Sequence, residues 1–368
     1  SRAEVAVARL RAWPDACLVT LAALLAACAS PRPDAEIDRE GPSLVAVRVG
    51  GEPTRMVASR DGRTLLVATA GPHGVSVIDP RRPGTPRRIP VPVRERDEAG
   101  EETFGYVADI AIAEDGTVAW ACTTEGQVFS LDLARGAIRD SLELPGHATV
   151  AIVVDDARGR VIVGSEEGAI LALEPAGPRE LLRPGQPVRR MKRTGDLLDV
   201  AAGPTAFGGS GIPGGEREIT PDRLLTLDLA SDRLAAQAPP TTSRPVDFAR
   251  GPDGLLVATD GDDERLLEFD GRWSPRGERR MGVFCSWDLA FRGDRLLVSS
   301  MNEGRVLEYG VSEGRLSSEP VAEYALPEKG GRLVVLDGDW FAVAPAPGDS
   351  VLLVHRSWAR PFSGFEEP

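Results

Sequence analysis

RMVASRDGRTLLVAT (residues 55–69) has a close counterpart further along the chain, PVDFARGPDGLLVAT (residues 245–259). In both stretches a short apolar run reaches an acidic residue plus glycine, turns, and enters a second apolar run. Related units recur roughly every 45 residues from Pro53 to the C-terminus, and in several of them a third strand ends in aspartate. A period of this length, with several short strands in each unit, predicts the blades of a β-propeller.

The turn between the first two strands of each unit counts the blades. It falls at seven glycines: Gly62, Gly116, Gly159, Gly195, Gly254, Gly293 and Gly338. The last unit has room for three strands only, whereas residues 43–49 form a strand without a blade of its own. We expect this strand to become the outer strand of the last blade, which closes the ring and leaves no open sheet edge between the first and last blades. The predicted fold is therefore an all-β, seven-bladed propeller.

The first unit carries a family resemblance. Residues 51–53 (GEP) lead into the inner strand, Asp61-Gly62 makes the turn, and residues 75–80 (VSVIDP) form the third strand. This unit resembles the YVTN family of propeller repeats, and the resemblance implies a relationship to propeller lactonases with YVTN-like repeats. The other units match less closely.

One blade departs from the pattern. In the fourth unit, the connection between the second and third strands runs from Gly203 to Asp222 and is rich in glycine and proline. Long insertions in compact domains are often lids or binding loops. A tolerated surface excursion explains the segment equally well, so its role stays open.

The N-terminal residues have the features of a targeting segment. Arg9 and Arg11 precede an apolar run, Ala16 to Ala27, that is too short to span a bilayer comfortably. The run ends in LAAC (residues 25–28), which resembles the lipobox of bacterial lipoproteins. The resemblance implies a signal peptide over residues 1–27, lipidation at Cys28, a tether over residues 28–42, and a propeller domain over residues 43–368. An ordinary secretory signal with a chance cysteine is the alternative.

The expected location follows from this N-terminus. Ala29, rather than aspartate, follows the cysteine, and this resembles lipoproteins passed to the outer membrane. We therefore expect a lipid-anchored protein of the bacterial cell envelope, either periplasmic or surface-exposed. Of the other cysteines, Cys122 and Cys285 fall in different predicted blades, so no disulfide is expected between them.

The face that carries the start of each inner strand is the predicted binding face. The inner strands start at charged residues in six of seven units, and the candidates for the mouth of the axial channel are Arg55, Asp109, Arg189, Asp247, Asp288 and Arg332. The neighbouring turns supply an acidic rim, with candidates Glu125, Glu166, Asp260, Asp262, Asp263 and Glu303. A polar pocket for a small ligand, or a docking surface for a partner protein, would use these charges. A purely structural role, in which the charges neutralise one another across a hydrated channel, is the other interpretation.

Several classes of function are disfavoured by what the chain contains. A net charge of -13 argues against a nucleic-acid partner. The three histidines fall in different blades without metal-ligand spacing, and no catalytic triad, phosphate loop or dinucleotide motif is present. We expect no cofactor, although a weak Ca²⁺ site within the acidic cluster of residues 260–264 is compatible with oxygen ligands.

The sequence thus predicts a membrane-anchored propeller that binds a ligand or a partner protein through its acidic face. Whether it is an enzyme is left open. The enzymatic alternative is a lactonase-like hydrolase of a sugar or acyl lactone at the channel mouth, in which arginines would stabilise an oxyanion and aspartates would position water.

Overall fold

The computed structural model describes residues 43–93, 105–203, 222–239, 245–260, 264–281, 286–300, 302–345 and 347–365. These residues belong to one unit of the chain, Ile37–Pro368. Several expectations lie outside the described residues: the signal peptide, Cys28 and the tether, residues 204–221 of the insertion, Asp262, Asp263 and Cys285. Within the described ranges, no helix has the length and apolar character needed to cross a bilayer.

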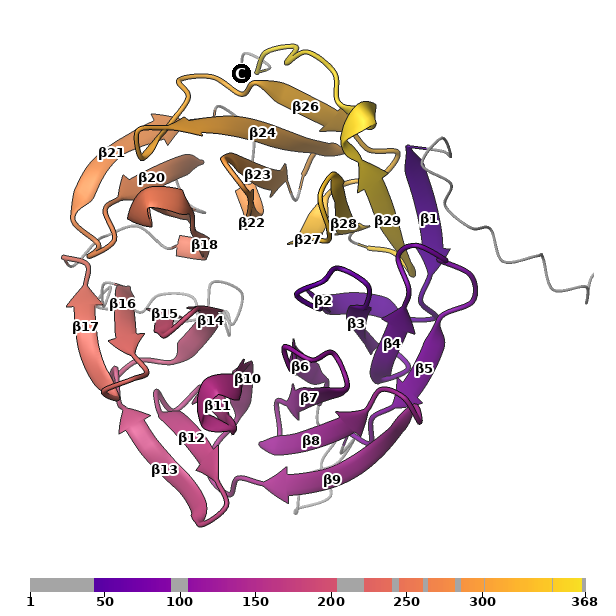
Figure 1. The fold of residues 1–368 in the computed structure, drawn as a ribbon, viewed down its shortest axis with the longest axis vertical. Helices are drawn as coiled ribbons and strands as arrows, with labels where there is room; N and C mark the ends of the chain where they lie inside the picture. The colour runs from indigo at the N-terminus through magenta and orange to yellow at the C-terminus, as the bar shows by residue number, and fades with distance from the viewer. Residues whose placement is uncertain are drawn as a thin grey trace, which may run out of the picture. The chain divides into compact units, whose positions relative to one another are not determined.

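Seven separate antiparallel sheets stand around a central axis (Figure 1), so the seven-bladed propeller is confirmed. In chain order, the seven inner strands of blades I to VII are β2 (Glu52–Ala58), β6 (Val107–Ile112), β10 (Thr149–Asp155), β14 (Val188–Thr194), β18 (Pro245–Arg250), β22 (Ser286–Arg292) and β27 (Gly331–Val335). The second strands are β3 (Leu65–Ala70), β7 (Val118–Thr123), β11 (Arg160–Ser165), β15 (Leu197–Ala202), β19 (Leu256–Asp260), β23 (Arg295–Ser300) and β28 (Trp340–Pro345).

The outer half of each blade follows the same order. The third strands are β4 (Gly74–Ile78), β8 (Gln127–Asp132), β12 (Ile170–Glu174), β16 (Arg223–Asp228), β20 (Arg265–Phe269), β24 (Arg305–Ser312) and β29 (Ser350–His355). The outermost strands are β5 (Arg87–Pro90), β9 (Ala137–Glu143), β13 (Gly177–Leu182), β17 (Arg233–Gln237), β21 (Pro275–Arg280), β26 (Ala322–Ala325) and β1 (Leu44–Arg48), and a short β25 (Arg315–Leu316) also pairs with β24. Helical structure among the described residues consists of three 3-10 turns: η2 (Asp156–Arg158), η3 (Pro252–Gly254) and η4 (Arg356–Trp358).

The N-terminal strand closes the ring as the sequence predicts. β1 pairs antiparallel with β29 in blade VII, with Leu44 opposite Val354 and Arg48 opposite Ser350. Figure 1 shows β1 at the outer edge of that blade, beside the first blade. Because the first and last parts of the propeller share one sheet, separating blade VII from blade I requires this strand pair to break.

The hydrophobic core is divided among the blade interfaces. Each of seven apolar clusters joins two neighbouring blades; for example, Leu66 and Val75 of blade I pack with Ala119 and Phe129 of blade II. Burial decreases outward within a blade, since β11 is buried along its whole length while β9 is mostly exposed. This gradient explains why the second strands are continuous apolar runs in the sequence and the outermost strands are polar.

The turn after the inner strand of blade I requires glycine for two reasons. Gly62 adopts a φ of 64°, in the left-handed region that favours glycine. A Cβ atom at this position would lie 2.6 Å from the backbone nitrogen of Asp337 in blade VII. The repeated acidic residue plus glycine is therefore required here both by backbone conformation and by close packing.

Inner strands share an irregularity near their start. In six of the seven, the pairing with the second strand shifts by one residue, for instance between Pro53 and Arg55 and between Val188 and Arg190. A β-bulge of this kind re-aims the side chains next to it. The bulges thus decide which residues face the axis at the predicted binding face.

Candidate functional site at the axial channel

Seven charged side chains of the inner strands gather around the axis. We call them the axial charge layer: Arg55, Asp109, Arg190, Lys192, Asp247, Asp288 and Arg332. Five of the six mouth candidates belong to this layer, and they come from blades I, II, V, VI and VII. Four basic side chains face three carboxylates, so the layer carries an excess of positive charge. That excess differs in sign from the net charge of the chain.

The three aspartates of the layer have a common structural role. Each places Oδ2 on a backbone N–H in the inner strand of the next blade: Asp109 on Ile152 at 3.0 Å, Asp247 on Leu289 at 2.8 Å, and Asp288 on Leu333 at 2.9 Å. A buried backbone N–H without a partner is costly, so these bonds help to hold adjacent blades together. The recurrence of aspartate at this point of the repeat is explained by blade-to-blade contact.

Two basic residues that sequence reasoning did not select complete the layer. The Arg190 guanidinium lies 3.2 Å from Asp247 Oδ1 and 3.3 Å from Asp288 Oδ1. The Lys192 amine donates to Asp247 Oδ2 at 2.6 Å and to the carbonyl oxygen of Leu289 at 3.0 Å. The composition could have drawn attention to Lys192, because the chain contains only two lysines, Lys192 and Lys329.

Arg189 is placed differently from the expectation. Its guanidinium pairs with Asp222 at 2.7 Å and is not one of the axial groups. The bulge between Val188 and Arg190 adds one residue to β14, and the alternation of strand side chains then turns residues 190 and 192 to the axis. The repeat pattern therefore predicted the axial arginine of this blade one position too early in the sequence, at Arg189 instead of Arg190.

Asp247 and Asp288 differ in their affinity for a proton. Burial, together with the nearby charge of Asp288, raises the pKa of Asp247 to about 6. Burial also opposes ionisation of Asp288, but the charge of Arg190, a hydrogen bond from Asp247 and the charge of Lys192 outweigh it and hold the pKa of Asp288 well below its usual range. Two carboxylates in one buried site titrate as a coupled pair, so the proton taken up near pH 6 belongs to the Asp247–Asp288 pair.

A pocket opens on the face where the inner strands start. This mouth pocket has a volume of about 310 Å³ and is lined by Arg55, Tyr106, Trp287 and Arg332 among others. The Arg332 guanidinium lies over the Trp287 ring, 4.9 Å from its centroid. Burial, and the charges of Arg55 and Arg190, lower the pKa of Arg332 to about 9.

Arg55 experiences the same crowding of positive charge. Its pKa is lowered by burial and by Arg190, and its carboxylate partner Asp109 lies 3.7 Å from Nε. Arg332 forms no ion pair with the described residues, although the charges of Asp288 and Asp247 partly offset the lowering of its pKa and Glu52 lines the same pocket. Two arginines that repel each other in a buried pocket can be relieved by an anion, and a guanidinium binds carboxylate or phosphate oxygens in a bidentate manner.

The predicted acidic rim is less negative than the sequence indicates. Asp260 is almost fully buried and pairs with Arg265 at 3.3 Å, and Glu303 accepts from Nε of Arg305 at 2.6 Å. Glu125 is half-buried, while Glu166 is exposed to solvent. No group of acidic, histidine or cysteine side chains within the described ranges could hold a metal ion. Two members of the expected Ca²⁺ cluster lie outside those ranges, so that site stays a prediction.

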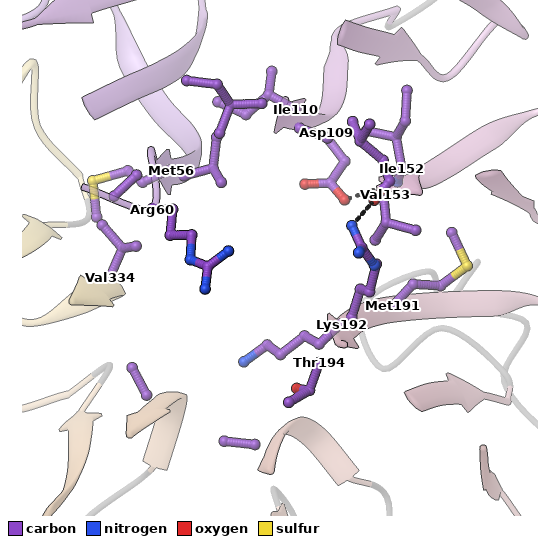
Figure 2. Close-up of a pocket in the computed structure, with 18 of the residues that line it drawn as sticks. Met56, Arg60, Asp109, Ile110, Ile152, Val153, Met191, Lys192, Thr194 and Val334 are labelled. Atoms are coloured by element: carbon purple, nitrogen blue, oxygen red, sulfur yellow. Dashed lines mark hydrogen bonds between the residues drawn. The ribbon is translucent and has the colours of Figure 1, made fainter. Parts of the chain in front are cut away.

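A larger cavity lies on the other side of the charge layer. This axial cavity has a volume of about 510 Å³ and is lined by later residues of the same inner strands, including Met56, Ile110 and Val334 (Figure 2). Residues 52–55 of β2 line the mouth pocket, whereas residues 56–58 of the same strand line the axial cavity. The axial charge layer therefore separates two compartments of the channel.

The thiol of Cys122 is not a candidate nucleophile. It is a free cysteine, fully buried within β7, and burial followed by the charge of Asp109 raises its pKa far above the ordinary range. A thiol that does not ionise near neutral pH is neither a good nucleophile nor a good metal ligand. Its role is to fill the core between blades II and III.

Solved structures share this architecture. The chain is similar to virginiamycin B lyase from Staphylococcus aureus, with 15% identity, a TM-score of 0.64, and coverage of 85% of this chain and 98% of that one. It is also similar to hydrazine synthase of Kuenenia stuttgartiensis, with 14% identity, a TM-score of 0.66, and coverage of 83% and 95%. The chain is a seven-bladed β-propeller. Identities this low show the fold and no more than the fold.

A protein of the mitotic checkpoint complex is a further structural neighbour, with 14% identity, a TM-score of 0.64, and coverage of 89% of this chain and 96% of that one. Propellers commonly serve as protein-binding scaffolds, and this neighbour belongs to an assembly of proteins. No protein-family model matches the sequence, and no curated protein is significantly similar to it.

Proposed function

We propose that this protein is a lipid-anchored binding module of the bacterial cell envelope that captures a small anionic ligand at the mouth of its axial channel. The observation that carries the proposal is the mouth pocket, in which Arg55 and Arg332 face the same small volume beside Trp287. Positive charge in a recessed pocket with aromatic walls suits a carboxylate or phosphate group attached to a compact body.

The proposed binding site lies on the axis and not at the acidic rim that the sequence predicts. Asp260 and Glu303 are already paired with arginines of their own hairpins, so they offer little free negative charge to a basic partner. Arg332 has no such carboxylate partner in the described part of the chain. A small anion at the mouth is therefore better supported than a basic protein docked on an acidic rim, although the fold itself is suited to protein binding.

Binding of small anions to purified protein tests the proposal. Calorimetric titration of phosphate, acetate and citrate separates phosphate from carboxylate ligands, and Arg332→Gln should weaken any affinity at least about tenfold because a buried charge-assisted bond is lost. Arg48→Gln is the matched control, since the Arg48 side chain is 85% exposed and does not line the pocket. The proposal is wrong if no anion binds, or if both variants bind as the wild type does.

Membrane anchoring is supported by residues 25–28, whose LAAC pattern supplies the acceptor thiol of Cys28. Attached acyl chains hold a protein stably at a membrane when two or more are present. Replacement Cys28→Ser in a bacterial host should yield an unprocessed, unlipidated precursor on gels and by mass spectrometry. Normal maturation of that variant would remove the anchor from the proposal.

A lactonase is the second candidate, and one observation favours it: two arginines line the mouth pocket, and arginine is a residue type that stabilises an oxyanion. The candidate aspartates favour it less, because Asp247 and Asp288 are buried and bonded to backbone amides of the next blade. Turnover of a broad panel of sugar and acyl lactones by the purified protein, abolished in Arg55→Gln, would support this candidate. An absence of turnover across the panel would exclude it.

A further inference from the structure

The axial cavity has apolar walls, which play no part in the ligand binding proposed for the mouth pocket. Its lining includes Met56, Ile110, Ile152, Leu289 and Leu333, contributed by five different inner strands. A volume of about 510 Å³ is within the range of small-molecule sites, which are mostly apolar with a few polar groups that fix orientation. The walls thus suit a hydrocarbon body.

The closed end of this cavity is cationic. Arg190 and Lys192 line it, whereas Asp247 and Asp288 do not. The side chains of Lys192 and Arg190 are 26% and 14% exposed, but those of Asp247 and Asp288 are 0% and 2% exposed. A ligand that reaches the charge layer from this side therefore meets Arg190, Lys192 and Asp109, while Asp247 and Asp288 lie behind them.

The Lys192 amine retains a donor for such a ligand. An ammonium group has three N–H donors, and the structure directs two of them to Asp247 Oδ2 and to the Leu289 carbonyl. Asp288 Oδ1 also lies 3.8 Å from the amine, which is beyond hydrogen-bond distance. Figure 2 shows the Lys192 side chain extending into the open centre of the cavity. Asp109 is the third charged residue of the layer that lines this end of the cavity. Its carboxylate accepts a hydrogen bond from the backbone N–H of Ile152 and lies beside Arg55.

The open end of the cavity is balanced in charge. Arg60 pairs with Glu114 at 3.3 Å, and Arg193 lies 3.4 Å from Glu114 and 3.7 Å from Asp156. At the inner end, two cations of the charge layer, Arg190 and Lys192, line the cavity with one carboxylate, Asp109, so this end keeps an excess of positive charge. Along β2 the lining of the cavity runs from Met56 to Ala58, and Arg60 in the following turn continues it to the open end.

We propose that the axial cavity is a second binding site, which takes an aliphatic carboxylate. The carboxylate lies against Lys192 and Arg190 at the charge layer, and the hydrocarbon chain extends along the apolar walls toward the open end. This site is separate from the mouth pocket, because the charge layer lies between them. It does not depend on the proposed function of the mouth.

Decanoate is the probe for this site. Calorimetric titration of the purified protein should show binding of decanoate, with 1-decanol at least about tenfold weaker because it lacks the charge that Lys192 recognises. Acetate, which has the charge without the chain, should not compete with decanoate. Lys192→Met should reduce the affinity for decanoate to that for decanol, and Lys192→Arg should restore much of it.

A second pair of variants leaves the charge layer intact. Val334 lines the cavity, and Val334→Trp should abolish decanoate binding by filling it; the same substitution at Val321, which is 45% exposed, should have no effect. Anion binding at the mouth pocket should survive Val334→Trp, so the two sites are tested separately. The proposal is overturned if decanoate does not bind the wild type, if decanol binds equally well, or if Val334→Trp binds decanoate normally.

Discussion

Charge pairs at the rim of the propeller join residues of one hairpin, whereas charge pairs on its axis join different blades. At the rim, Glu303 bonds to Arg305, two residues away. On the axis, Arg190 of blade IV reaches Asp288 of blade VI, 98 residues away. The rim pairs would form in almost any fold that makes the hairpin, but the axial pairs exist only when the ring is closed.

The difference indicates what each set of charges does for the protein. A partly exposed pair within a hairpin is screened by solvent and contributes little to stability. The axial groups are buried, and each carboxylate there also accepts a backbone N–H of the next blade. Loss of one member leaves a buried charge without compensation, which is far more costly than loss of a surface pair.

The largest effect is expected for Asp288→Asn. The carboxylate of Asp288 faces Arg190 and Lys192, and its pKa is held well below the usual range by them against the effect of burial. Removing its charge should lower the free energy of unfolding by about 3–5 kcal/mol, because the largely buried Arg190 and the partly buried Lys192 would then share a single ion-pair carboxylate, Asp247. Urea unfolding followed by circular dichroism measures the change.

Asp294→Asn is the matched control for this experiment. Asp294 belongs to the same blade, but its side chain is 73% exposed and lies 3.7 Å from Arg295. Its replacement should change the free energy of unfolding by less than about 0.5 kcal/mol. Equal effects of the two substitutions would show that the axis is no different from the surface.

Asp247→Asn should have a smaller effect that depends on pH. The pKa of Asp247 is raised to about 6 by burial and by Asp288, so the folded protein binds a proton at pH 5 that the unfolded chain, with a pKa of about 4, does not. The stabilisation from this proton is present below about pH 4 and is lost as the pH rises through 6. Asparagine mimics the protonated form and does not titrate. The free energy of unfolding of the variant, measured relative to that of the wild type, should therefore rise by about 2–3 kcal/mol as the pH increases from 4 to 7.

Urea unfolding of both proteins at pH 4, 5, 6 and 7 measures this relative change. Asp288→Asn should also flatten the pH dependence over this range, because the replacement removes a charge that raises the pKa of Asp247. A constant difference between Asp247→Asn and the wild type would contradict proton uptake by the Asp247–Asp288 pair near pH 6.

The sequence predicted the fold well because the repeat is local. Acidic residue plus glycine turns and buried second strands recur within each unit, and even the closing strand could be found as an apolar run without a blade. The site was predicted less completely. Lys192 and Arg190 were missed, and Arg189 was chosen instead, because a one-residue bulge decides which side of β14 faces the axis. A bulge depends on contacts with neighbouring strands, which periodicity within one strand does not reveal.

The smallest effect is expected at the rim, for Glu303→Gln. Arg305 keeps a second carboxylate, Glu323, at 3.4 Å, and glutamine retains an oxygen that can accept from Arg305. The free energy of unfolding should fall by at most about 1 kcal/mol, and added salt should reduce the difference because partly exposed pairs are screened. Urea unfolding at low and high ionic strength measures both quantities. A loss as large as that of Asp288→Asn would mean that rim carboxylates also connect the blades, and the contrast between local and ring-dependent charges would then have to be abandoned.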